Sequence, residues 1–178
     1  MDIVVTGLAG LEGSTIIYNN KECREKLLKK YSKSFFGVFE KAMEDTDKAA
    51  ELDVLFDSYL ADGMAADGAE GGVLAALWRV LKANRLGGTY SQRNIPLLQQ
   101  TVELCEMFEL NPYRLHSPGC RVWLSGDPGR IIEAASACKM PYSIIGFTSR
   151  TVAVKRTDTE GESSLRRPEK DELGKINL

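Results

Sequence analysis

The chain has 178 residues, of which 43% are hydrophobic and 27% charged, and its formal net charge is −2. This composition is typical of one soluble globular domain with a buried core, and the charge balance offers no positive field to nucleic acid or an anionic membrane. No apolar run approaches the ~20 residues that span a bilayer, and the amino terminus lacks the basic and long apolar regions of a signal peptide. We therefore expect a cytoplasmic protein that binds no nucleic acid and no membrane.

The first third of the chain is predicted to contain one strand followed by helices. Residues 3–6 are β-branched and predict a strand, which runs into a glycine-rich turn. A helix in two pieces follows, and Asn20 is placed to cap the second piece. The charged run at 44–47 interrupts a further apolar helical stripe, so we expect one break there. The stripe comprises Phe35, Phe39, Ala42 and Met43 before the break, and Leu52, Leu55, Phe56 and Tyr59 after it.

The middle third is predicted to contain two amphipathic helices. A small-residue segment at 61–72 leads into the first helix, which Gly87 and Gly88 are expected to end in the left-handed conformation. Residues 89–91 predict a short strand, and Pro96 is expected in the first turn of the second helix. The buried stripes are predicted to be Val73, Leu74, Leu77, Trp78 and Leu81 in the first helix, and Leu98, Val102, Cys105 and Phe108 in the second.

The last third predicts strands at 120–124, 142–147 and 151–154, the last two joined as a hairpin. Asp127 and Pro128 predict the start of a helix, whose core stripe is Ile131, Ile132, Ala135 and Cys138. Residues 157–164 read as a hairpin turn or mobile loop. We expect one domain over 1–167 and a loosely held charged tail over 168–178. Because strands and helices alternate without a uniform β-α-β repeat, the pattern favours an α/β (α+β) fold with a mixed sheet.

The four cysteines predict core thiols. Cys23, Cys105, Cys120 and Cys138 are scattered, with no C-x-x-C pair and no histidine at metal-ligand spacing. Such thiols behave as small apolar residues, so we expect neither a disulfide framework nor a metal site.

The strongest candidate for a binding site is the segment from Asp67 to Gly72 at a predicted helix start. Glycines such as Gly71 and Gly72 let a phosphate approach the exposed N–H groups at such a start. Asp67 and Glu70, however, also have the spacing of a capping box, in which each carboxylate accepts a hydrogen bond from an unpaired N–H. The same acidic side chains would repel an anion unless Mg²⁺ intervened. Both interpretations remain open from the residues alone.

Two further turns carry candidate site residues. Gly7, Gly10 and Gly13 follow a strand and precede a helix, but they match neither a dinucleotide-binding fingerprint nor a phosphate-binding loop. A tight turn with close helix–sheet packing is the favoured interpretation for Gly10, Glu12 and Gly13. The only histidine, His116, lies with Ser117 and Gly119 in a turn before a strand. No third group is evident to orient a Ser–His pair, so we expect a cleft turn rather than a nucleophile.

The order of these motifs resembles the carboxyl-terminal domain of the AIR synthase superfamily, in the branch related to the hydrogenase-maturation carbamoyl dehydratase. Residues 2–6 and 9–14 are similar to the family's junction strand and "AGxEGT" turn. Residues 67–73 resemble its "DPTEGG" helix start, with Gly68 and Ala69 in place of Pro and Thr. The segments 95–96 with 110–112, and 144–148, resemble "IPV…LGLDPL" and "xVIGxVT".

This resemblance implies a three-layer α/β/α domain that is partly ferredoxin-like. In complete members, an amino-terminal half dimerises and binds ATP and Mg²⁺, and the carboxyl-terminal domain closes over the cleft. The implied reaction is ATP-dependent activation of an amide or carboxamide oxygen. The phosphate- or substrate-binding residues would be Asp67, Glu70, Gly71 and Gly72.

Two departures limit what the resemblance implies. Met1 falls at the position where, in complete members, the ATP-binding half ends and the carboxyl-terminal half begins. We therefore expect the ATP-binding half to be a separate or missing partner. The related branch ends in Pro-Arg-Ile-Cys, whereas this chain ends in residues 174–178 without a cysteine. We therefore expect no catalysis and no cofactor in this chain alone, with a homo-oligomer as a possible partner state. The alternative is a stand-alone interaction or structural module that has lost ligand binding.

Overall fold

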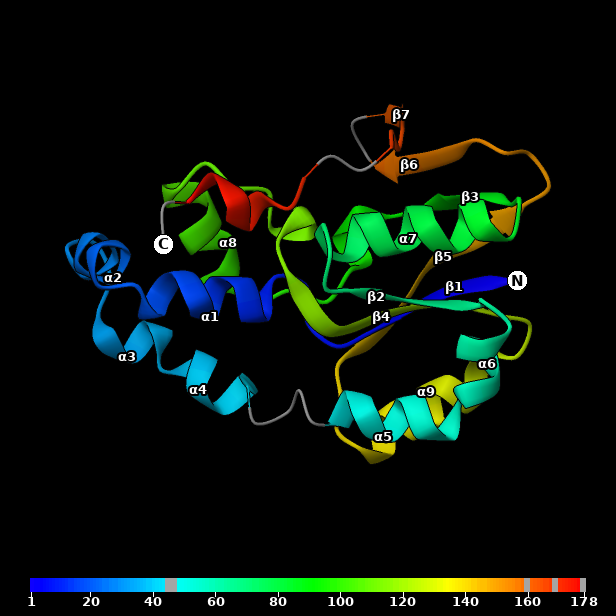
Figure 1. The fold of residues 1–178 in the computed structure, drawn as a ribbon, viewed down its shortest axis with the longest axis horizontal. Helices are drawn as coiled ribbons and strands as arrows, with labels where there is room; N and C mark the ends of the chain where they lie inside the picture. Colours follow the sequence, from blue (N-terminus) through cyan, green and yellow to red (C-terminus); the bar gives the residue numbers. More distant parts are fainter. Residues whose placement is uncertain (44–47, 159–160, 168–169, 177–178) are drawn as a thin grey trace.

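A seven-stranded mixed sheet organises the molecule, in the strand order β2-β4-β1-β5-β3-β6-β7 (Figure 1). The computed structural model describes residues 1–43, 48–158, 161–167 and 170–176. The predicted first strand is confirmed as β1 (Asp2–Thr6), which lies between β4 (Ser117–Ser125) and β5 (Tyr142–Ser149), antiparallel to both. The mixed sheet expected from the sequence is confirmed, because β3 (Gly87–Tyr90) runs antiparallel to β5 and parallel to β6 (Val154–Asp158).

The predicted hairpin between the strands at 142–147 and 151–154 is wrong. Strand β3 lies between β5 and β6, and the hairpin is instead formed by β6 with β7 (Gly161–Ser164). Glycines make this insertion possible, since a Cβ on Gly87 would collide with the carbonyl oxygens of Thr151 and Ala153. The same contact explains why Gly87 and Gly88 do not end a helix. Both are strand residues, and the lack of a side chain lets the neighbouring backbone come close to them.

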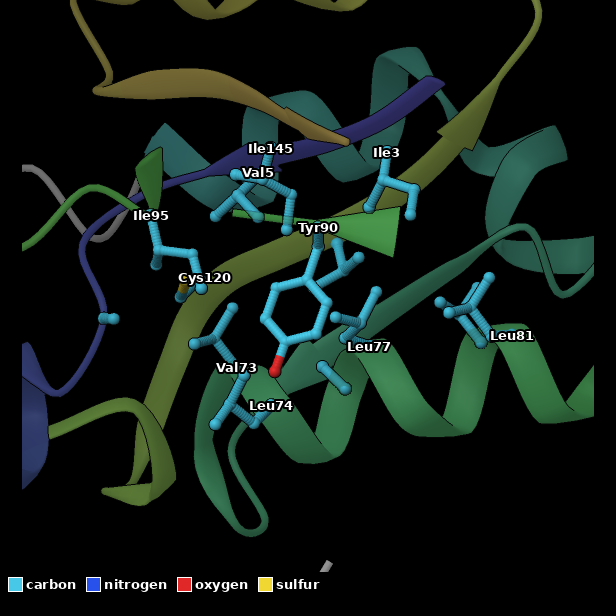
Figure 2. Packing of buried hydrophobic residues seen from close by; sticks show 14 of the residues in the cluster. Ile3, Val5, Val73, Leu74, Leu77, Leu81, Tyr90, Ile95, Cys120 and Ile145 are labelled. Carbon is cyan, nitrogen blue, oxygen red and sulfur yellow. The ribbon is translucent and has the colours of Figure 1, made fainter. Parts of the chain in front are cut away.

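Helix α7 (Gly72–Ala83) covers one face of the sheet (Figures 1 and 2). Val73, Leu77 and Leu81 face side chains from β1, β3, β4 and β5, as predicted. Trp78, predicted for the same buried stripe, is only partly buried and lines a cavity instead. The helix ends at Ala83 with Asn84 as its C-cap, and the left-handed residue that follows is Arg85, with a φ of 53°.

Helices α5 (Lys48–Leu55), α6 (Asp57–Ala61) and α9 (Pro128–Ala137) lie on the opposite face (Figure 1). Asp127 is the N-cap of α9 and Pro128 its first residue, as predicted. The apolar core there contains Trp123, whose indole N–H donates to the Thr6 hydroxyl at 2.9 Å. Leu55, predicted for the buried stripe, is instead 62% exposed.

A third group of helices lies beyond the end of the sheet (Figure 1). Asn20 caps the second of them as predicted, since its side chain accepts from the Cys23 N–H at 3.1 Å. Helix α8 begins at Gln99 rather than at Pro96, because the Pro96 carbonyl stays in a loop and accepts from the Ala9 N–H at 2.9 Å. Its buried face is therefore shifted, and Val102 is 39% exposed. The helices are α1 (Leu11–Asn19), α2 (Lys21–Leu28), α3 (Lys33–Phe36), α4 (Val38–Met43) and α8 (Gln99–Met107).

Short elements complete the fold and position the site. Strand β2 (Ala65–Gly68), which the sequence analysis missed, pairs with β4. Two 3₁₀ turns, η1 (Gln92–Asn94) and η2 (Pro112–Arg114), follow β3 and α8. A third, η3 (Glu172–Lys175), brings the tail against the helices beyond the sheet, where Leu173 and Ile176 pack on their apolar core. Residues 170–176 of the tail thus contact the apolar core of these helices.

Within the described ranges, no helix has the length and apolar character to cross a membrane, and no group of three or more metal-ligating side chains gathers. All four cysteines are free thiols.

Thiol reactivity tests this packing. Burial raises the pKa of Cys105 and of Cys120 to about 12. Burial and the Glu51 carboxylate, which accepts from the Cys138 thiol at 3.5 Å, also raise the pKa of Cys138, but this thiol is only half-buried and so more accessible to a reagent. Because the thiolate is the reactive form, we expect Cys138 to react with a disulfide reagent at least about tenfold faster than Cys105 or Cys120. Time-resolved labelling of the folded chain measures this. A Cys138→Ser variant that keeps the fast phase would contradict the assignment, and denatured chain should lose the distinction.

Candidate functional site at the start of helix α7

Two left-handed glycines set the start of α7. Strand β2 ends at Gly68, and the helix begins at Gly72 with Gly71 as its N-cap. Gly71 and Gly72 have φ values of 74° and 70°, a conformation that other residues rarely adopt. A Cβ on Gly72 would also lie 2.8 Å from the Arg114 Cα, so this glycine is required for packing against η2.

The predicted capping box of Asp67 and Glu70 does not form. Asp67 belongs to β2, and its carboxylate accepts from the Ala69 and Gly119 N–H groups while pairing with Arg121. Glu70 is exposed, and its carbonyl accepts from the Arg79 guanidinium at 2.7 Å. Because Gly71 and Gly72 are left-handed, α7 begins at Gly72, several residues after Asp67. The Asp67 carboxylate therefore cannot cap the helix as the spacing predicted, and no side chain of the preceding turn caps α7.

The carboxylate of Asp171 takes the capping role instead. Its Oδ2 accepts from the Gly71 N–H at 2.8 Å, and its Oδ1 accepts from the N–H groups of Leu173 at 2.9 Å and His116 at 3.2 Å. A negative charge at a helix N-terminus is stabilised by the exposed N–H groups and the helix dipole. Sequence reasoning missed this residue because it lies 100 positions away from Gly71.

His116 joins the glycine turn to the helix start. Its Nδ1 lies 2.5 Å from the Ala69 carbonyl oxygen, and its carbonyl accepts from the Gly13 N–H at 3.0 Å. Since a carbonyl oxygen only accepts, Nδ1 carries the proton in the neutral ring. The other nitrogen, Nε2, lies 3.8 Å from the Glu12 carboxylate. The structure therefore brings together Glu12, His116 and the predicted segment from Asp67 to Gly72.

Packing and hydrogen bonds to the backbone hold the turn before β4 against the glycine turn, and they involve Ser117, Gly10 and Gly13. The buried Ser117 hydroxyl donates to the Leu115 carbonyl at 2.5 Å and accepts from the Gly10 N–H at 2.6 Å. A Cβ on Gly13 would lie 2.6 Å from Leu115 Cγ, so the turn packs tightly, as predicted. Gly119 occupies a left-handed position with a φ of 82°.

Arg121 is a further site residue that the sequence analysis missed. Its guanidinium makes two hydrogen bonds to the Asp53 carboxylate, at 2.6 and 3.0 Å, and pairs with Asp67 through its remaining terminal nitrogen. The pairing fixes β4, β2 and α5 relative to one another. Its side chain is 14% exposed, which reduces solvent screening of the ion pairs.

A cavity of about 900 Å³ opens beside the helix start. Its walls are formed by the turn before α7, the first turns of α7 and the tail, and it includes His116 and Asp171. Three cationic side chains, Arg79, Arg167 and Lys170, line it together with apolar surface. The apolar lining residues are Ala75, Trp78, Leu173 and Ile176. The cavity thus suits a ligand with an apolar body and an anionic group.

Neither a protein-family model nor a curated protein matches the sequence, but solved structures match the fold. One is HypE from E. coli, with a TM-score of 0.66 and 19% identity over 98% of this chain and 52% of that chain. Another is the hydrogenase maturation protein HypE in complex with ATP, with a TM-score of 0.62 and 16% identity over 97% of this chain and 52% of that one. Thiamine-monophosphate kinase from Stenotrophomonas maltophilia matches with a TM-score of 0.53 and 15% identity, over 87% and 49%.

These matches confirm the predicted resemblance at the level of fold: the chain has the α/β fold of AIR synthase-related proteins. The fold corresponds to about half of the HypE chain. The chain spans about half the length of the HypE chains it matches.

Removal of the Asp171 carboxylate tests the site geometry. We expect Asp171→Ala to lower the free energy of unfolding by about 0.5–2 kcal/mol, because the Gly71 N–H loses its acceptor at the helix start. Asp127→Ala is a matched control, since Asp127 is the N-cap of α9 and its side chain makes no capping hydrogen bond. That variant should change stability by less than about 0.5 kcal/mol. Equal losses for the two variants in urea unfolding would contradict the role of Asp171.

Proposed function

We propose that this chain is one half of an AIR synthase-like ATP-dependent protein, contributing its helix start at 67–72 to a phosphate- or substrate-binding cleft and inactive alone. The observation that supports this most is coverage: nearly the whole chain aligns with about half of each matched HypE chain. Nucleotide is present in the HypE–ATP complex and in the PurL–ADP complex from Thermotoga maritima, which matches with a TM-score of 0.50. The finer role of the helix start is our inference.

The chemistry of the helix start supports an anionic ligand. The N–H groups of Gly71 and Gly72 lie at the positive end of α7, and a carboxylate oxygen already accepts from Gly71. A phosphate could use the same N–H only if Asp171 withdrew from it. The nearby cations Arg79 and Lys170 would favour that exchange. His116 would complete the wall that faces the ligand.

Mg²⁺, which the resemblance implies beside ATP, is not matched by a metal-ligand cluster in the described part of this chain. Glu70 and Asp171 offer carboxylates at the cavity, but Mg²⁺ generally takes one or two protein carboxylates together with substrate phosphates. We therefore assign most of its protein ligands to the companion half. This chain would contribute phosphate contacts and the cavity wall.

The companion half, or a second copy of this chain, needs a surface to contact. Strand β5 exposes Tyr142, Ile144 and Phe147, with 40%, 40% and 59% of these residues accessible. Such a row of apolar residues favours an interaction surface over an isolated sheet face. It supports the proposal that the chain works in an assembly.

One observation favours the alternative, a stand-alone structural or interaction module. The Gly71 N–H already has an intramolecular acceptor, and Gly72 and Gly13 are explained by packing alone. A helix start satisfied in this way needs no ligand. The two candidates therefore differ in whether an external anion can replace the Asp171 carboxylate.

Titration with ATP–Mg²⁺, followed through the backbone amide signals of residues 69–72, separates the two functions. We expect saturable shifts, and an affinity at least about threefold higher in Asp171→Asn, because the competing charge is gone. Asp127→Asn controls for the loss of one negative charge elsewhere. If neither the native chain nor Asp171→Asn responds, the helix start is structural and the alternative holds. ATP turnover by the purified chain would contradict the claim that it is inactive alone.

A further inference from the structure

Two neighbouring carboxylates fasten residues 170–176 of the tail, which lie beside α8 (Figure 1). The first is Asp171, which accepts from the N–H at the start of α7. The second is Glu172, a residue that is only 5% exposed. Its carboxylate accepts from the Asn111 N–H at 3.2 Å and from the Lys175 ammonium at 2.7 Å. The segment is therefore held at the α7 start and at the helices beyond the sheet.

The Asp171 carboxylate is tied to more than the Gly71 N–H. It also accepts from the N–H groups of His116 and Leu173, and all three hydrogen bonds are partly buried. Rotation of the Asp171 side chain alone would leave these donors without their acceptor and shielded from water, which is costly. Withdrawal of the whole segment exposes the same donors to water. Movement of residues 170–176 together is therefore the easier way to free the Gly71 N–H.

The attachment at Glu172 is weak enough to be released. Burying a carboxylate costs free energy, which its partners offset only when they are close and themselves shielded from water. One partner, the Lys175 side chain, is 60% exposed, so solvent screens much of its attraction. Leu173 and Ile176 add packing, but both are only partly buried. A segment held by so few contacts opens at a lower free energy than the whole domain.

The thiol of Cys105 lies close to this attachment. It is buried in the apolar cluster against which Leu173 and Ile176 pack. Burial and the nearby Glu172 charge together raise its pKa. Cys120 is equally buried, but it belongs to the separate cluster between α7 and the sheet. Release of the tail segment would therefore uncover Cys105 and leave Cys120 protected.

We propose that residues 170–176 form a strap, held closed by Glu172, that has to open before a phosphate group binds at the α7 start. While it is closed, the strap keeps the Asp171 carboxylate on the N–H that the phosphate needs, so the tail inhibits the site. This inference rests on the function proposed for residues 67–72. It adds that ligand binding and exposure of the surface under the strap are linked, because both require the open state.

Thiol labelling of the full chain, resolved by peptide mass spectrometry, tests the strap. Glu172→Ala and Leu173→Ala should each raise the labelling rate of Cys105 at least about threefold and leave Cys120 unchanged, because the opening is local. Leu173→Ala changes no charge, so its effect cannot come from a lower pKa of the thiol. Glu106→Ala, at an exposed position of α8, is the matched control and should leave both rates unchanged.

The same labelling with ATP–Mg²⁺ connects the strap to the ligand. In the native chain at saturating nucleotide, we expect Cys105 to react at least about threefold faster than without nucleotide, because binding selects the open strap. Glu172→Ala should bind ATP–Mg²⁺ at least about threefold more tightly than the native chain, whereas Glu106→Ala should bind with unchanged affinity. If Glu172→Ala does not fold, Leu173→Ala and the native chain carry the test.

The remaining outcomes separate the strap from the function proposed for the α7 start. Saturable amide shifts at residues 69–72, with Cys105 still at its slow rate, would overturn the strap and leave that function standing. Binding found only in Glu172→Ala would support both. No binding in either chain would overturn that function and, with it, the inhibitory role of the strap. Equal acceleration of Cys105 and Cys120 in the variants indicates general destabilisation and would overturn the role of Glu172.

Discussion

The carboxylate of Asp171 is the contact on which the site depends. It accepts from three backbone N–H groups that come from three segments: Gly71 before α7, His116 before β4, and Leu173 in η3. Each N–H would otherwise need another acceptor, because unpaired backbone donors are costly to bury. One side chain thus fixes the start of a helix, the turn before a strand and the path of the tail.

This contact also defines what the helix start can do. The position that an external phosphate would take at the Gly71 N–H is held by a carboxylate of the same chain. Binding of a phosphate there is therefore an exchange of one anion for another, and the nearby cations Arg79, Arg167 and Lys170 favour the more highly charged ligand.

Local patterns in the sequence predicted the elements that depend on local forces. The β-branched run of β1, the Asn20 cap, the Asp127–Pro128 helix start and the apolar stripe of α7 are all determined by neighbouring residues. All are confirmed, except that Trp78 lies outside the α7 stripe. The alternation of strands and helices predicted a mixed sheet, and the family resemblance added the class of known fold to which the sheet and helices belong. The structural matches confirm that class.

The errors share a cause in non-local contacts. Glycine preference alone cannot distinguish a left-handed helix end from a strand that needs close approach, and Gly87 proved to be the second. The spacing of Asp67 and Glu70 fits a capping box, but the left-handed Gly71 and Gly72 delay the helix. Asp171 and Arg121 act across long sequence separations, so no periodicity or motif could have indicated them.

A crystal structure of the chain grown with ATP–Mg²⁺ tests the central claim most directly. We expect a phosphate oxygen within hydrogen-bond distance of the Gly71 or Gly72 nitrogen, and the Asp171 carboxylate withdrawn from Gly71. An Asp171 carboxylate still bound to Gly71, with no nucleotide beside the α7 start at saturating concentration, would contradict it.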